Sequence, residues 1–332
     1  MAVSFRLLLG LYLIVPFCLL LYGLDVGFWQ NYLHDNLPSK PTHFLLFQIL
    51  FGTPHILASA VLLTTNREYF QFYKRDLAWA TLAIAVVFGI GSLFISYYVF
   101  YVAVAGWTVF HVLKQQHGVV RGICQLPNWA FHSLLWMSVA AGLLIYIGVF
   151  LHNRLEIETL GQLKNAAGLL TTILVLLAFY CQRYVPTSFG KTFFWANVFL
   201  VVSSFYFFTQ EYFFFAILIP RLVHDATAYI FYVTHDFNKH SVEPKNAFYR
   251  FAKRYSISIF VLLPISTFAA AFILQAYGDV AIAWLTREIF GHEIRKVVTL
   301  GVIGYLSLMH YFSEAITWKS GSPYRQFISF SK

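Results

Sequence analysis

Apolar runs long enough to cross a lipid bilayer recur along the whole chain, and they constrain the fold more than any other feature. A transmembrane helix needs about 20 mostly apolar residues. The runs predict about ten spans, with nine or eleven as alternatives, at residues 5–23, 43–64, 77–96, 98–114, 130–151, 164–181, 192–208, 211–234, 256–276 and 297–317. Only 11% of residues are charged, against about 25% in a soluble domain. We therefore expect an all-α, polytopic membrane bundle that forms a single transmembrane domain over residues 1–332.

Three stretches need a separate interpretation. The spans at 77–96 and 98–114 are nearly contiguous, so they form either a tight hairpin or one long bent element. The segment 279–290 is apolar but short, which suits an interfacial or re-entrant piece. Only Arg6 precedes the first apolar core, and no small-residue cleavage site follows it, so we expect a retained span and not a cleaved signal peptide.

The distribution of Lys and Arg predicts the orientation of the spans. With ten spans, sixteen of these residues fall on the side that holds the N-terminus and six fall on the opposite side. Cytoplasmic loops carry the excess of positive charge, so both termini are predicted to be cytoplasmic, in a bacterial inner membrane. The net charge of +9 is then mostly a topological signal, and no nucleic-acid partner is expected.

Four histidines lie inside the predicted spans, at mid-depth or in the cytoplasmic half. Six others are at span ends or in loops, where an ordinary solvated or headgroup position is expected: His34, His43, His132, His152, His240 and His292. His55 falls just past the middle of its span, His111 near the cytoplasmic end, His224 midway, and His310 two thirds of the way along. An ionisable side chain inside a span is costly and indicates function. A lone imidazole commonly makes a hydrogen bond between helices, but four at similar depth favour one shared metal site.

Charged neighbours of these histidines have two interpretations each. Glu314 follows His310 by four residues and shares its helical face, so it is a further ligand, an acceptor that orients the imidazole, or a partner of Lys319. Asp225 follows Arg221 by four residues, and an ion pair between them explains two charges in one span.

Three further residues are interpreted from their positions relative to His111 on one α-helix. Lys114 and Gln115 share the face of His111 and are expected to line a cavity near it. His117 lies on another face and is expected at the interface, unless Gly118 ends the helix.

Two prolines and one more histidine complete the pattern. Pro54 and Pro220 lie within a turn of His55 and His224, where a helix break would open a cavity. His235 is eleven residues after His224, about 16 Å along a helix axis, too far to share its metal. It is expected to act around the site or at its mouth, with a headgroup-level position as the alternative.

The order of these motifs resembles the Brp/Blh-like family, membrane-embedded β-carotene dioxygenases that form retinal. The resemblance rests on four elements separated by 56, 113 and 86 residues, namely Gly52-Thr53-Pro54-His55, Phe110-His111, Val223-His224 and Met309-His310 with Glu314. The chain departs from the family pattern after the first histidine, at Ile56 to Ser59. Membership would imply that His55, His111, His224 and His310 hold one non-haem iron, with a lipophilic substrate entering from the bilayer.

The expected function is therefore an integral-membrane, non-haem metal oxygenase that uses Fe(II) and O₂. Imidazole ligands with an open position suit iron or copper. Oxidative cleavage of a carotenoid or other isoprenoid is the leading reaction, and hydroxylation or desaturation of a lipid comes next. Histidine boxes of the HxxxH type are absent, which disfavours a di-iron enzyme. The alternatives are a proton-coupled transporter that uses intramembrane His and Asp/Glu, and a bis-His haem protein.

Overall fold

The computed structural model describes residues 1–38, 52–319 and 321–331, and these residues are almost entirely helical. Six helical segments are long and apolar enough to cross a membrane: Phe5–Gly27, Asn128–Leu151, Ile157–Tyr184, Ser188–Thr209, Phe213–His240 and Ile259–Phe290. The protein is thus an all-helical membrane protein by composition and helix length. The count of ten spans and the cytoplasmic termini stay predictions. Part of the expected span at 43–64, together with His43, lies outside the described residues.

The chain divides into two compact units, each built from discontinuous segments. The first unit comprises Met1–Phe5, Leu46–Tyr97 and Thr227–Lys332, and the second comprises Arg6–Leu45 and Tyr98–Ala226. The prediction that residues 1–332 act as one transmembrane domain is not decided by this division. Each unit is described separately below.

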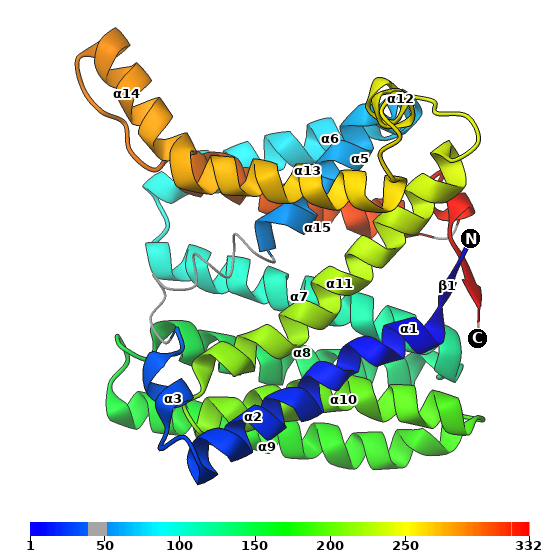
Figure 1. Ribbon diagram of the computed structural model, residues 1–332. Coiled ribbons are helices and arrows are strands. Elements are labelled where there is room, and N and C mark those ends of the chain that lie inside the picture. The colour runs from blue at the N-terminus through cyan, green and yellow to red at the C-terminus, as the bar shows by residue number, and fades with distance from the viewer. Residues whose placement is uncertain (39–51, 320, 332) are drawn as a thin grey trace. The chain divides into compact units, whose positions relative to one another are not determined.

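The first unit packs helices from the middle and the end of the chain against one another (Figure 1). Its elements are β1 (Ala2–Ser4), α5 (Thr53–Thr65), α6 (Arg67–Ile84), η4 (Ala85–Ile90), η5 (Gly91–Leu93), the second part of α11 (Phe213–His240), α12 (Ala247–Arg254), α13 (Ile259–Ile273), η7 (Leu274–Gly278), α14 (Asp279–Phe290), η8 (Val297–Val302), α15 (Ile303–Thr317), η9 (Arg325–Phe327) and β2 (Ser329–Ser331). Helix α5 contacts α6, α13 and α15. These contacts bury the face of α5 that carries His55.

The two ends of the chain pair in this unit. Strands β1 and β2 are parallel, with Ala2 opposite Ser329 and Val3 opposite Phe330, and the pairing is visible beside the N and C labels in Figure 1. The Asn238 side chain of α11 donates to the carbonyl oxygens of Met1 and Phe327 at 2.8 and 2.7 Å. The short strands, which pair over three residues, thereby gain partners for backbone groups that the strand pairing leaves unpaired.

The second unit is a bundle of long apolar helices. Its elements are α1 (Phe5–Gly10), η1 (Leu11–Leu13), α2 (Ile14–Gly27), α3 (Tyr32–Asn36), α7 (Tyr97–Cys124), α8 (Asn128–Leu151), α9 (Ile157–Cys181), η6 (Gln182–Tyr184), α10 (Ser188–Thr209) and the first part of α11. Helices α8, α9 and α10 pack on one another. Their close approach uses glycine, because a Cβ on Gly148 would lie 2.3 Å from Phe208 Cζ.

Helix boundaries bear on three expectations. His55 lies in the first turn of α5, and Pro54 occupies one of the first two positions of this helix, where its missing N–H costs nothing. Residues 43–51 of the predicted span lie outside the described residues, so the position of His55 along that span stays a prediction. Helical structure stops after η5 and resumes at Tyr97, so 77–96 and 98–114 are two elements and not one bent helix. The segment 279–290 is not a separate interfacial or re-entrant piece, because α13, η7 and α14 form one continuous helical run.

Candidate metal site

The first unit brings two of the predicted histidines into direct contact. His55 projects from the first turn of α5 and His310 from the middle of α15, and each is only 1% exposed. Their Nε2 atoms are 3.0 Å apart, and their rings meet edge to face with centroids 4.6 Å apart. Two nitrogen atoms from sequence positions 255 residues apart thus face the same point.

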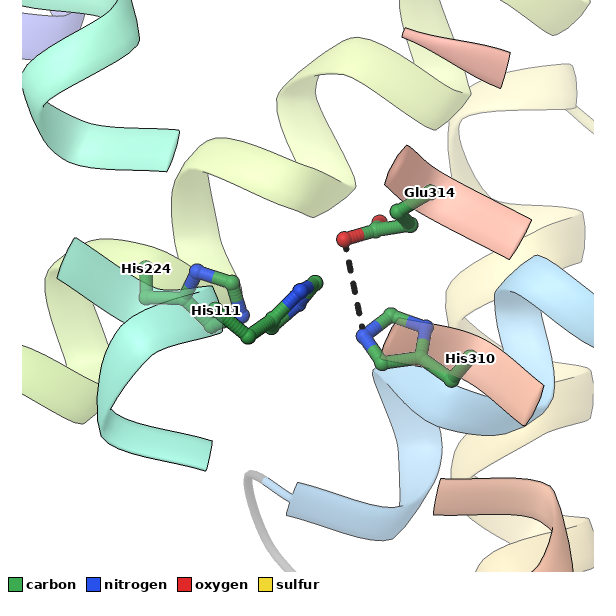
Figure 2. A group of neighbouring side chains, drawn as sticks. All are labelled: His111, His224, His310 and Glu314. Atoms are coloured by element: carbon green, nitrogen blue, oxygen red, sulfur yellow. Dashed lines mark ion pairs between the residues drawn. The ribbon is translucent and has the colours of Figure 1, made fainter. Parts of the chain in front are cut away.

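A carboxylate completes this group. Glu314 lies one turn after His310 on α15, and its Oε2 is 3.5 Å from His310 Nε2 (Figure 2). The other carboxylate oxygen, Oε1, accepts a hydrogen bond from the hydroxyl of Tyr232 on α11. Glu314 is 2% exposed. The predicted shared face of His310 and Glu314 is therefore confirmed, and the carboxylate contacts the imidazole directly.

A serine on α5 decides which nitrogen of His310 carries the proton. Ser59 Oγ is 2.8 Å from the carbonyl oxygen of Ile56, to which it donates, and 2.8 Å from His310 Nδ1. Because the hydroxyl has one hydrogen, Ser59 must accept from Nδ1–H. The Nε2 atom of His310 then presents a lone pair toward Glu314 and His55, so His55 Nε2–H is the donor between the two rings.

The spacing of these atoms fits a mononuclear metal site. At metal–nitrogen distances of about 2.0–2.1 Å, two ligands at right angles have nitrogens roughly 3 Å apart, and a wider angle gives a larger separation. The 3.0 Å and 3.5 Å separations measured from His310 Nε2 lie in this range. Two imidazoles with one carboxylate are also the ligand set of non-haem iron(II) oxygenases. His310 Nε2 is therefore close enough to His55 and to Glu314 for each pair to share a divalent metal.

The second unit pairs the other two predicted histidines. His111 on α7 and His224 on α11 meet edge to face, with ring centroids 5.0 Å apart (Figure 2). Their exposed fractions are 6% and 1%. The structure thus places the four predicted residues as two buried pairs, one in each unit. A single centre that contains both pairs stays a prediction.

The charges beside His224 form the expected ion pair. Arg221 Nε donates to Asp225 Oδ2 at 3.2 Å, one turn along α11. The other oxygen, Asp225 Oδ1, lies 3.9 Å from His224 Nε2. One carboxylate therefore serves both the guanidinium and the surroundings of the imidazole. Helix α11 continues through Pro220, so the helix break expected there is not present.

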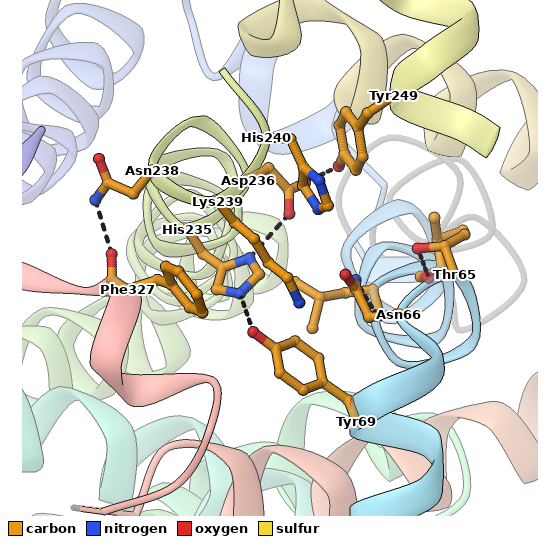
Figure 3. Close-up of polar contacts among 12 residues, drawn as sticks. Thr65, Asn66, Tyr69, His235, Asp236, Asn238, Lys239, His240, Tyr249 and Phe327 are labelled. Carbon is orange, nitrogen blue, oxygen red and sulfur yellow. Dashed lines mark hydrogen bonds and ion pairs between the residues drawn. The ribbon is translucent and has the colours of Figure 1, made fainter. Parts of the chain in front are cut away.

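His235 belongs to a separate buried network in the first unit (Figure 3). Its Nε2 is 2.7 Å from the hydroxyl of Tyr69, and its Nδ1 is 2.9 Å from Asp236 Oδ1. Asp236 also accepts from the hydroxyl of Tyr249. His235 is completely buried within the protein, and its depth in the membrane stays a prediction. Both ring nitrogens already have partners, which leaves none for a metal.

One expectation near His111 needs correction. Lys114 is exposed and holds its ammonium 5.1 Å from the centroid of the Phe110 ring, so it does not line a buried cavity; Gln115 is half-buried. Helix α7 continues past Gly118 to Cys124, and the His117 imidazole is 4% exposed; its position at the membrane interface stays a prediction. Its nitrogens contact Ser138 at 3.0 Å and Asn197 at 3.2 Å, and a hydrogen-bonded pair of this kind suits a buried ring.

Sequence reasoning missed the residues that orient the site. Ser59 and Tyr232 contact His310 and Glu314 from other helices, and no spacing within one helix could have predicted them. His240, expected in an ordinary position at a span end, is buried against Tyr249 with ring centroids 4.2 Å apart.

Comparison of the chain with protein-family models, with curated proteins and with solved structures finds no match. The resemblance to the Brp/Blh-like family therefore stays a prediction.

Proposed function

We propose that this protein is an integral-membrane, non-haem iron oxygenase that acts on a lipophilic substrate. The observation that carries the proposal is the buried imidazole of His310, whose Nε2 lies 3.0 Å from His55 Nε2 and 3.5 Å from Glu314 Oε2, so that two imidazoles and one carboxylate are available as ligands. This ligand set leaves open positions for O₂ and substrate on iron(II). Cleavage of an isoprenoid is the leading reaction, and hydroxylation or desaturation of a lipid is next.

The residues around the ligands would prepare them for this role. Ser59 holds the Nδ1 proton of His310 and keeps its Nε2 lone pair directed at the metal position. Tyr232 donates to Glu314 and so fixes one carboxylate oxygen while the other faces His310. Hydrogen bonds of this kind orient metal ligands and tune their basicity. His55 must release the proton on Nε2, or shift it to Nδ1, before it can act as a ligand.

The same distance argues against haem bound between these two histidines. Axial nitrogens on opposite faces of one iron would be about 4 Å apart at metal–nitrogen distances of about 2.0 Å. The Nε2 atoms of His55 and His310 are 3.0 Å apart and face each other edge to face. Adjacent positions on one metal fit this geometry, whereas opposite positions would require the helices to separate.

Metal analysis of detergent-purified protein tests the proposal. We expect about one iron per chain, no Soret band, and loss of the iron in His55→Ala, His310→Ala and Glu314→Ala. His240→Gln is the matched control, because His240 is equally buried but lies outside the ligand group. Full iron content in the three ligand variants, or activity in metal-free protein, would refute the proposal.

The second histidine pair is tested in the same experiment. Loss of iron from His111→Ala and His224→Ala would show that both pairs serve one centre. Full iron content in these variants, with loss in the variants of the first pair, would assign the ligands to His55, His310 and Glu314 alone.

A further inference from the structure

An apolar pocket in the first unit leads to the candidate metal ligand His310. It lies among α5, α6 and α15 and has a volume of about 340 Å³. Most of its wall is aliphatic, with Ala60 and Leu63 from α5, Leu77 and Ala78 from α6, and Leu306 and Met309 from α15. Pockets of about 300–1,000 Å³ with few polar groups are typical of small-molecule sites. The pocket is therefore suited to an apolar ligand.

The depth of the pocket follows from the exposure of its wall. His310 and Ser59, at 1% and 5% exposure, form the floor, whereas Phe70, at 50% exposure, and Lys74 are exposed and form the rim. A ligand bound here would thus extend from the protein surface to the imidazole that contacts Glu314. Because the rim is already exposed at the protein surface, a ligand can enter the pocket without the helices moving apart.

Lys74 is the one charged side chain among the residues that line the pocket. Other polar wall groups satisfy each other or the backbone; for example, the hydroxyls of Thr81 and Tyr305 are 2.8 Å apart. Among the described residues Lys74 forms no ion pair. A lysine ammonium on a flexible stem is a point charge that suits a single anionic group. The polar end of a ligand would therefore be negatively charged and would lie at the rim.

The volume restricts the apolar part to one chain. At about 30 Å³ for a group the size of a water molecule, 340 Å³ holds roughly eleven groups. This matches one medium-length alkyl chain or the end of a longer one inside the pocket. One cation and one narrow apolar pocket together define an amphiphile with a single chain.

We propose that this pocket binds a single-chain carboxylate, of the fatty-acid or isoprenoid-acid type, with the carboxylate on Lys74 and the chain directed at His310. The assignment of this acid as a substrate rests on the proposed function, since the end of its chain would lie beside the metal ligands. It narrows the substrate from any lipophilic molecule to an acid that reaches the site laterally from the membrane surface.

Binding of radiolabelled dodecanoate to chelator-treated protein in phosphatidylcholine nanodiscs tests the proposal. We expect saturable binding of one molecule per chain. Lys74→Met should weaken dodecanoate binding about tenfold, the effect of losing one charge-assisted contact, and leave dodecanol binding unchanged. Lys74→Arg should retain dodecanoate. Ala78→Phe should weaken both ligands, because the added ring would fill the pocket.

Arg75→Met is the matched control, because it removes one positive charge from the adjacent position of α6 but does not line the pocket. Equal weakening by Lys74→Met and Arg75→Met would reduce the effect to surface charge and overturn the proposal. Stronger binding of lysophosphatidylglycerol than of dodecanoate would overturn the carboxylate assignment. The binding assay uses chelator-treated protein, so its result does not depend on iron. If dodecanoate binds in a Lys74-dependent way but the protein as purified contains no iron, the proposed function is refuted and the pocket assignment stands. If the protein as purified contains iron but dodecanoate binding does not depend on Lys74, the pocket assignment is refuted and the proposed function stands.

Discussion

The hydrogen bond from Ser59 to His310 gives the most direct test of how the candidate site is organised. In the unmodified protein, Ser59 Oγ lies 2.8 Å from His310 Nδ1 and accepts its proton. Ser59→Ala removes this acceptor and frees the imidazole to adopt the tautomer whose Nε2 carries a proton. Loss of such an orienting partner typically lowers metal affinity roughly 10- to 100-fold, equivalent to about 1.4–2.8 kcal/mol. The metal-free protein should lose only about 1 kcal/mol of unfolding free energy, the net value of one hydrogen bond.

Ser313→Ala provides a closely matched comparison. Ser313 is also buried, at 2% exposure, and its Oγ donates to the backbone carbonyl of His310 at 3.1 Å, not to the ring. It should lose a similar unfolding free energy while keeping the metal affinity of the unmodified protein. Competition with a graded series of chelators measures the affinity, and thermal unfolding of chelator-treated protein measures the stability. Equal metal affinities in Ser59→Ala and Ser313→Ala would refute the tautomer argument.

Two further predictions concern helix packing and pH. Gly148→Ala should lower the unfolding free energy by about 1–3 kcal/mol, because the new Cβ would lie 2.3 Å from Phe208 Cζ; Gly161→Ala, with nothing within 4 Å, should be neutral or stabilising in the same thermal assay. The hydrogen bond from Lys239 lowers the pKa of Glu68 below its usual value of 4.5. The Glu68–Lys239 pair therefore stabilises the fold above pH 4.5, and this stabilisation is lost as the pH falls through the lowered pKa. Because the Glu68 side chain is 56% exposed, Glu68→Gln should lower the unfolding free energy by at most about 1 kcal/mol at pH 7. The difference between the two proteins should vanish in acid, and a difference that does not change with pH would contradict this prediction.

Contacts within one helix could be predicted from the sequence. The pairing of Arg221 with Asp225 and the shared face of His310 and Glu314 follow from a spacing of four residues, because helix geometry places such residues next to each other.

Contacts between helices could not be predicted. Nothing in the sequence indicates that His55 meets His310, that Ser59 accepts from its ring, or that Tyr232 contacts Glu314. The burial of His117 and His235 was missed for the same reason, since their partners lie on other helices. Hydropathy treats these residues as costly polar groups, but the cost depends on partners that only packing supplies.

The sequence by itself determined that this protein lies in a membrane and which side chains share a face of each helix. Apolar runs require a membrane, and the regular helix that a membrane imposes fixes which side chains share a face. The tertiary structure decided which faces meet. Lipid gives no hydrophobic drive to join one apolar helix face to another, so the choice depends on close packing and interhelical hydrogen bonds. That choice brings two imidazoles and a carboxylate together and places an apolar pocket with one cation at its rim in front of them.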